Sequence, residues 1–101
     1  MKTPPTYDLD KIKELLKVEE TRIITSSARR EAVLLGYADG DAMADRVLML
    51  QANEFYKTME AETIPGLWQD VYRSDDLTVT LYIKLQISFN GKGVIISFKE
   101  K

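Results

Sequence analysis

The sequence predicts an α+β fold in which a twisted, mainly antiparallel β-sheet packs against N-terminal helices. Apolar residues recur at helical spacing through the first 50 positions, whereas residues 79–88 alternate strictly between apolar and polar. An Asn90-Gly91 dipeptide, which favours a tight hairpin turn, follows that alternation. Helical patterns that precede strand patterns are typical of a sheet with helices on one face. We expect one domain over residues 1–101.

After a non-helical lead-in at Pro4-Pro5, a helix and a short strand are expected. Asp8 can cap the N-terminus of this helix, because its side-chain oxygen can accept a hydrogen bond from a free backbone N–H. Apolar side chains on one face of the helix would then face the core: they are Leu9, Ile12, Leu15 and Leu16. Residues 22–25 are expected to form a short strand.

Two further helices are expected before the chain changes character. A serine at position 26 or 27 can cap the second helix, which ends at Leu35 because Gly36 suits the left-handed position after a helix. Asp39 or Asp41 opens the third helix. Its apolar residues are Met43, Val47, Leu48 and Leu50.

The second half of the chain predicts strands. Residues 53–59 and 68–73 are expected to form two of them, joined by a loop that contains a Pro-Gly dipeptide. Residues 74–76 are expected to form a turn. A long hairpin of residues 77–89 and 94–101 follows, and its apolar face is expected to pack on the helices.

A two-residue turn at Asn90-Gly91 would fix the register of this hairpin. Apolar residues would then oppose one another: Ile87 and Val94, Leu85 and Ile96, Ile83 and Phe98. On the outer face the opposed pairs would be Tyr82 with Lys99 and Lys84 with Ser97. Opposed Cβ atoms lie roughly 5 Å apart. A turn shifted to Gly91-Lys92 would pair Lys84 with Lys99 on the same face.

The composition limits the chemistry that the chain can perform. It has no histidine and no cysteine, which argues against a zinc site. The absence of cysteine fits a reducing cytoplasm, and neither a signal sequence nor a membrane-spanning stretch is visible. The net charge of −2 does not favour nucleic-acid binding in general. A local basic face can still bind phosphate, because charges are screened over about 10 Å.

Lysine, tyrosine, arginine and glutamine gather on the expected outer face of the sheet. The candidates are Lys57, Gln69, Arg73, Tyr82, Lys84 and Lys99. Such residues are common on the solvent side of a strand, and that is the simpler interpretation. They also match RNA cleavage, which needs a base for the 2′-hydroxyl, cations for the phosphorane and an acid for the leaving oxygen. Clustered lysines lower one another's pKa, which makes proton transfer near neutral pH feasible.

Four stretches hold these candidates: residues 54–59 (EFYKTM), 68–73 (WQDVYR), 81–84 (LYIK) and 96–101 (ISFKEK). Together they resemble the MqsR family of toxins from toxin–antitoxin systems, small mRNA interferases with a RelE-like fold. This resemblance implies a metal-independent endoribonuclease that needs no cofactor and is held inactive by a cognate antitoxin. Contact with operator DNA would be made only through the antitoxin.

The resemblance also assigns site residues. It puts the catalytic positions at Lys57, Gln69, Tyr82 and Lys99. Tyr82 would transfer protons, and Lys99 would bind the scissile phosphate or act as the acid. Lys57 would neutralise charge and Gln69 would orient the substrate. Arg73 and Lys84 are expected to contact phosphate because of their strand positions.

Two other functions remain open from the sequence. A non-catalytic domain of the same fold could bind an antitoxin-like partner or nucleic acid, and the slightly acidic balance, with Glu60 and Glu62 near the site, would fit a weakly active member. A DNA-binding regulator is disfavoured, because the helix expected over residues 41–51 carries only Arg46 as a basic residue.

Overall fold

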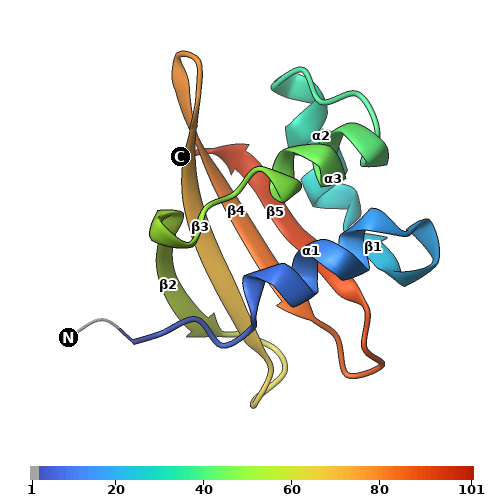
Figure 1. Cartoon of the computed structure of the whole chain (residues 1–101), viewed down its shortest axis with the longest axis vertical. Helices are drawn as coiled ribbons and strands as arrows, with labels where there is room; N and C mark the ends of the chain where they lie inside the picture. Colours follow the sequence, from blue (N-terminus) through green and yellow to red (C-terminus); the bar gives the residue numbers. More distant parts are fainter. Residues whose placement is uncertain (1–2) are drawn as a thin grey trace.

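The computed structural model describes residues 3–101 and contains three α-helices and one five-stranded sheet in that range (Figure 1). The elements follow in the order α1 (Leu9–Lys17), β1 (Arg22–Ile24), α2 (Ser26–Leu34), α3 (Gly40–Leu48), β2 (Phe55–Glu60), β3 (Trp68–Asp76), β4 (Val79–Ile87) and β5 (Gly93–Glu100). Short 3-10 turns at Glu19–Thr21 and Ala52–Glu54 precede β1 and β2. No helix among the described residues is long and apolar enough to cross a membrane.

The sheet has the strand order β1-β5-β4-β3-β2. The pairs from β2 to β5 are antiparallel, whereas β1 lies parallel to β5 at one edge. The helices lie together on one side of the sheet (Figure 1), with α1 and α2 both contacting β5. The α+β class and the mainly antiparallel sheet are therefore confirmed, with one parallel edge strand added.

The hydrophobic core fills the space between the sheet and the helices. On the hairpin side it contains Leu81, Ile83, Leu85, Ile95 and Phe98, all fully buried. The helices contribute Ile12, Leu16, Ala28, Ala32, Met43 and Val47. The period-two pattern of β4 thus places its apolar face on the helices, as predicted, and leaves the opposite face of the sheet open.

Side-chain caps begin each helix. Asp8 and Asp39 cap α1 and α3 by accepting from Asp10 N and Ala42 N. The serine cap expected for α2 is wrong, because Thr25 takes that role and accepts from Ala28 N at 3.1 Å. The Thr25 hydroxyl also donates to Ile96 O at 2.9 Å, so this cap ties α2 to β5.

The predicted hairpin register is right at the end far from the turn and wrong near the turn. Tyr82 faces Lys99, Lys84 faces Ser97 and Ile83 faces Phe98, as expected. A bulge after Lys84 then brings Leu85 opposite Ile95, Gln86 opposite Val94 and Ile87 opposite Gly93. The connection is a five-residue loop over residues 88–92, in which Ser88 N donates to Lys92 O. Gly91 has a φ of +82°, whereas Asn90 does not adopt a positive φ.

The expected turn at residues 74–76 is also wrong, because β3 continues through Asp76. Ser74 is buried, accepts from Arg46 Nη2 and donates to Glu54 Oε2, both at 2.6 Å. These bonds satisfy a polar residue that in isolation favours turns. The chain turns instead at residues 77–78, where Leu77 has a φ of +54°.

Candidate active site

Strand pairing brings Arg73, Tyr82 and Lys99 into one row on the open face of the sheet. Arg73 of β3 pairs with Tyr82 of β4, and Tyr82 pairs with Lys99 of β5. Directly paired residues point to the same side of a sheet. The Lys99 Nζ lies 5.5 Å from the centroid of the Tyr82 ring. The phenol and the ammonium therefore share one small area of surface, as the register predicted.

A second row runs beside the first. Lys57 of β2 pairs with Val71, Val71 with Lys84, and Lys84 with Ser97. Gln69 lies two residues before Val71 on the same face of β3 and pairs with Met59. The open face thus gathers all six residues singled out from the sequence. Lys57 and Lys99 are exposed, whereas Gln69, Arg73, Tyr82 and Lys84 are half-buried.

Tyr56 belongs to this face although the sequence gave no reason to select it. A bulge in β2 leaves Tyr56 between the paired residues Phe55 and Lys57. Its ring lies 3.5 Å from Arg73 Cζ and 5.4 Å from Lys57 Nζ. A cation over an aromatic face is attracted by the ring quadrupole. Tyr56 therefore holds the Arg73 guanidinium in place at the edge of the site.

A polar hollow of about 480 Å³ adjoins this stack. Its lining consists of Asn53, Glu54, Phe55, Tyr56, Arg73, Asp75 and Thr80. The Arg73 Nε is buried and has no hydrogen-bond partner among the described residues. A buried donor without a partner is rare in folded proteins. Two carboxylates, those of Glu54 and Asp75, also line this hollow.

The charges around Lys84 are mainly positive. Burial lowers the pKa of the Lys84 ammonium, and the charges of Lys99 and Lys57 lower it further. Glu62 acts on this pKa in the opposite direction. Glu60, which was also expected near the site, instead accepts from Gly66 N at 2.7 Å and pairs with Trp68 on the other side of the strands.

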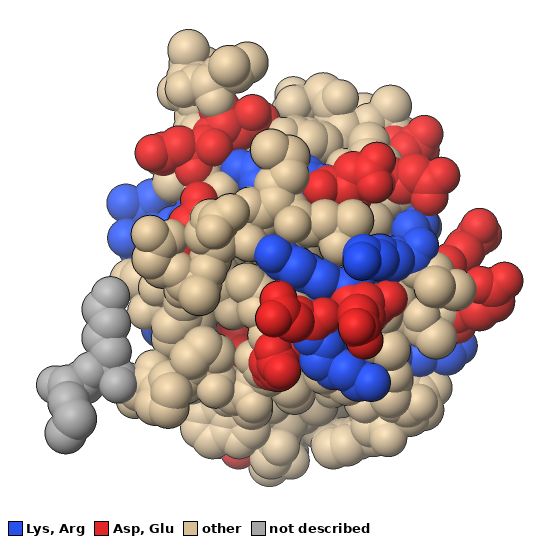
Figure 2. All heavy atoms as spheres, viewed as in Figure 1, with Lys and Arg blue, Asp and Glu red and all other residues tan. Residues whose placement is uncertain are grey.

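The helix side of the molecule carries a different charge pattern. Figure 2 shows that Lys and Arg side chains are interspersed there with Asp and Glu. The open face of the sheet instead presents Lys57, Arg73, Lys84 and Lys99 together, with Asp75 two residues from Arg73 on the same side of β3. A chain with a net charge of −2 therefore still has one locally basic face.

Asp70, beside Gln69 in the WQDVYR stretch, lies on the helix side of β3. Its side chain is fully buried and accepts from Thr6 N at 3.0 Å and Tyr7 N at 2.9 Å. The Tyr7 hydroxyl donates to Trp68 O at 2.7 Å. Asp70 thus fastens the N-terminal segment to β3 and takes no part in the open face.

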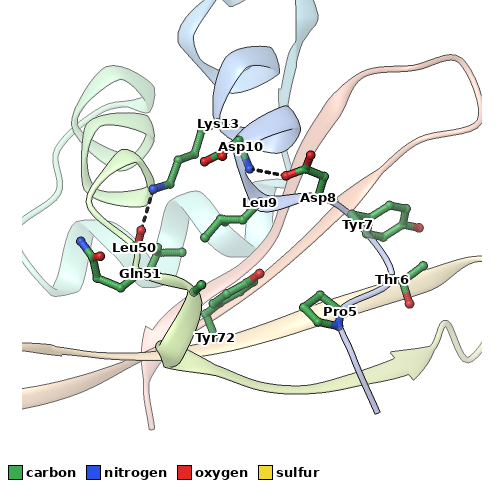
Figure 3. A pocket seen from close by; sticks show the side chains of 11 residues that line it. Pro5, Thr6, Tyr7, Asp8, Leu9, Asp10, Lys13, Leu50, Gln51 and Tyr72 are labelled. Atoms are coloured by element: carbon green, nitrogen blue, oxygen red, sulfur yellow. Dashed lines mark hydrogen bonds between the residues drawn. The ribbon is translucent and has the colours of Figure 1, made fainter. Parts of the chain in front are cut away.

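A second hollow, of about 550 Å³, lies on the helix side behind β3 (Figure 3). The N-terminal segment, the start of α1 and the Tyr72 ring surround it. Lys13 Nζ donates to Leu50 O across its rim at 2.6 Å. Among the described residues, no group of three or more acidic side chains is arranged to hold a metal ion.

The fold and the open face together define an α+β protein with a lysine-, arginine- and tyrosine-bearing surface suited to an anionic ligand. Residues 4–100 match the family described as "Motility quorum-sensing regulator, toxin of MqsA". The mRNA interferase toxin MqsR of Escherichia coli (strain K12) is 35% identical over 100 residues, which cover 99% of this chain and 98% of that relative. The chain therefore belongs to the MqsR toxin family.

Proposed function

We propose that this protein is the toxin of a toxin–antitoxin pair and an endoribonuclease that cleaves mRNA without a metal ion. The observation that carries this proposal is the pairing of Tyr82 with Lys99 beside Lys84 on an uncovered sheet face. The family membership and the name of the E. coli relative support the same activity. We assign the fold to the RelE-like group and the site of action to the cytoplasm.

The reaction is attack of a ribose 2′-hydroxyl on the adjacent phosphorus, with departure of the 5′-oxygen. Lys99 and Lys57 stabilise the negative charge that develops on the phosphoryl oxygens, since preorganised cations act most strongly on such charge. Tyr82, next to Lys99, takes part in proton transfer, and Gln69 orients the substrate. Arg73, held by Tyr56 on the open face, binds a neighbouring phosphate through its guanidinium.

The partner of this toxin is a cognate antitoxin. The family description names MqsA as the counterpart of its toxin. We infer that the antitoxin of this chain holds it inactive and that operator DNA is contacted only through the antitoxin.

A non-catalytic binding domain of the same fold is the competing function. The net charge of −2 and the acidic Glu62 beside the lysines favour it, because both weaken attraction for RNA. A binding domain would tolerate substitution of Tyr82 or Lys99 without a change in phenotype.

Cleavage of a long synthetic mRNA in EDTA separates these functions. Wild type is expected to cut the RNA, and Tyr82→Phe and Lys99→Ala are each expected to abolish cutting. Tyr7→Phe and Lys11→Ala are matched controls, because both positions lie away from the open face. Intact RNA with folded wild type would contradict the proposal. Cutting that survives in both site variants would show that the site is elsewhere.

A further inference from the structure

Lys84 occupies the centre of the open face. It lies in the middle of β4, with β3 on one side and β5 on the other. Tyr82 is two residues away on the same face of β4. Lys99 lies on the neighbouring strand β5, diagonally opposite Lys84. A substrate phosphate held between Lys57 and Lys99 would therefore lie over Lys84.

The surroundings of Lys84 disfavour its charged form. The side chain is half-buried, and within residues 3–101 it makes no ion pair or hydrogen bond. Two positive charges, those of Lys99 and Lys57, outweigh the opposing influence of Glu62 on its pKa. A lysine in such surroundings becomes a neutral amine more readily than one in water, and a neutral amine is a base.

The other charged groups near Lys84 differ from it in chemistry or in position. Arg73 on β3 carries a guanidinium, which has five N–H donors and no acceptor. Lys57 and Lys99 are exposed on β2 and β5. Tyr82 lies beside Lys99, and Glu62 belongs to the loop after β2.

We propose that the Lys84 amine is the general base that accepts the 2′-hydroxyl proton when this protein cleaves RNA. This inference rests on the proposed function and changes the role of Lys84 from phosphate contact to catalyst. As Nζ takes the proton, the 2′-oxygen forms a bond to phosphorus and the bond from phosphorus to the 5′-oxygen breaks. The 5′-oxygen receives a proton from the Lys99 ammonium or the Tyr82 phenol. The products are a 2′,3′-cyclic phosphate and a free 5′-hydroxyl. Lys84 then returns its proton to solvent, and the group that protonated the 5′-oxygen regains a proton from solvent.

Single-turnover cleavage in EDTA, measured from pH 5.5 to 9.5, tests this role. The wild-type rate is expected to rise with pH, because the active form of Lys84 is unprotonated. Lys84→Arg keeps the positive charge but cannot lose its proton. It is expected to bind RNA with near-normal affinity and to cleave it at least about 100-fold more slowly than wild type. Lys84→Met is expected to show a similar loss of cleavage rate.

Neighbouring charges give a second and independent readout. Glu62→Gln removes the charge that raises the pKa of Lys84, so the rising limb of the profile is expected to move to lower pH. Lys57→Met removes a charge that lowers this pKa. The rising limb of the pH–rate profile of this variant is therefore expected to move to higher pH, even if its maximal cleavage rate is reduced. The fluorescence of Trp68, the single tryptophan, checks that each variant is folded.

The outcomes separate the two proposals. Lys84→Arg that cleaves within about threefold of wild type would overturn the base role and leave the ribonuclease intact. A limb that stays in place in both Glu62→Gln and Lys57→Met would also overturn it. Folded wild type that fails to cleave RNA would overturn the proposed function, and the base role with it.

Discussion

Replacing Asp70 with asparagine is expected to destabilise the fold without damaging the open face. Asp70 and Gln69 are adjacent in one motif, but they lie on opposite sides of β3. The buried Asp70 carboxylate holds the N-terminal segment through two backbone N–H groups, those of Thr6 and Tyr7. Its effect on cleavage should therefore follow only from its effect on folding.

The size of this effect can be estimated from the two hydrogen bonds. Bonds to a charged group contribute about 1.5–3 kcal/mol each. Asparagine keeps one acceptor oxygen and places an NH2 group against the other N–H, so one bond is lost and one donor is left unpaired. We expect a loss of about 2–4 kcal/mol in the free energy of unfolding. For a chain of this size, Tm then falls by roughly 10–20 °C.

Urea unfolding followed by Trp68 fluorescence measures this loss, because Trp68 lies beside the clamp and its carbonyl accepts from Tyr7. Gln69→Ala is the matched control. It is expected to change stability by less than about 0.5 kcal/mol and to reduce cleavage. Asp70→Asn with wild-type stability, or with cleavage abolished while the protein is still folded, would refute the assignment of Asp70 as a structural clamp.

Three further predictions concern packing, titration and the edge of the site. Gly93→Ala is expected to cost about 1–3 kcal/mol in urea unfolding, because its Cβ would lie 2.9 Å from Leu15 Cβ; an unchanged midpoint would show that α1 moves freely. Burial, with Asp70 and Asp8, raises the pKa of Tyr72 to about 12, so folding stability from this residue is complete below pH 10 and is lost as pH rises towards 12. The free energy of unfolding of Tyr72→Phe is therefore expected to fall less steeply between these pH values than that of wild type, and parallel curves of stability against pH would contradict this. Tyr56→Leu is expected to weaken RNA binding about 2- to 5-fold by releasing Arg73, whereas Tyr56→Phe keeps the affinity; equal affinities in a filter-binding titration would exclude the stack as a contributor.

The part of the hairpin far from the turn was predictable, because the alternation of β4 leaves only one side of the strand apolar. A slip by one residue would expose that side, so the pairing of Tyr82 with Lys99 follows from burial. The turn was not predictable in the same way. Gly93 allows α1 to approach β5 closely, and a bulge at Ile96 replaces the expected pairing of Leu85 with Ile96 by a pairing with Ile95. Both depend on contacts between segments far apart in sequence.

Tyr56 could not be selected from the sequence for a similar reason, because its position also depends on a bulge. Strict alternation along β2 would put Tyr56 on the face opposite Lys57. The bulge between Phe55 and Lys57 breaks that alternation and lets Tyr56 reach Arg73. The cap of α2 also depended on tertiary structure, because Thr25 is selected over the following serines by its bond to Ile96 O.

The proposed cleavage requires that the open face of the sheet use the ribose 2′-hydroxyl as the nucleophile. The direct measurement compares two RNA oligonucleotides across one mapped cleavage position in EDTA, identical except for a 2′-deoxy nucleotide immediately before the scissile phosphate. We predict that the unmodified strand is cut to a cyclic phosphate and a 5′-hydroxyl and that the deoxy strand stays intact. Cutting of the deoxy strand at the same position, or cutting that requires added Mg²⁺, would contradict the account.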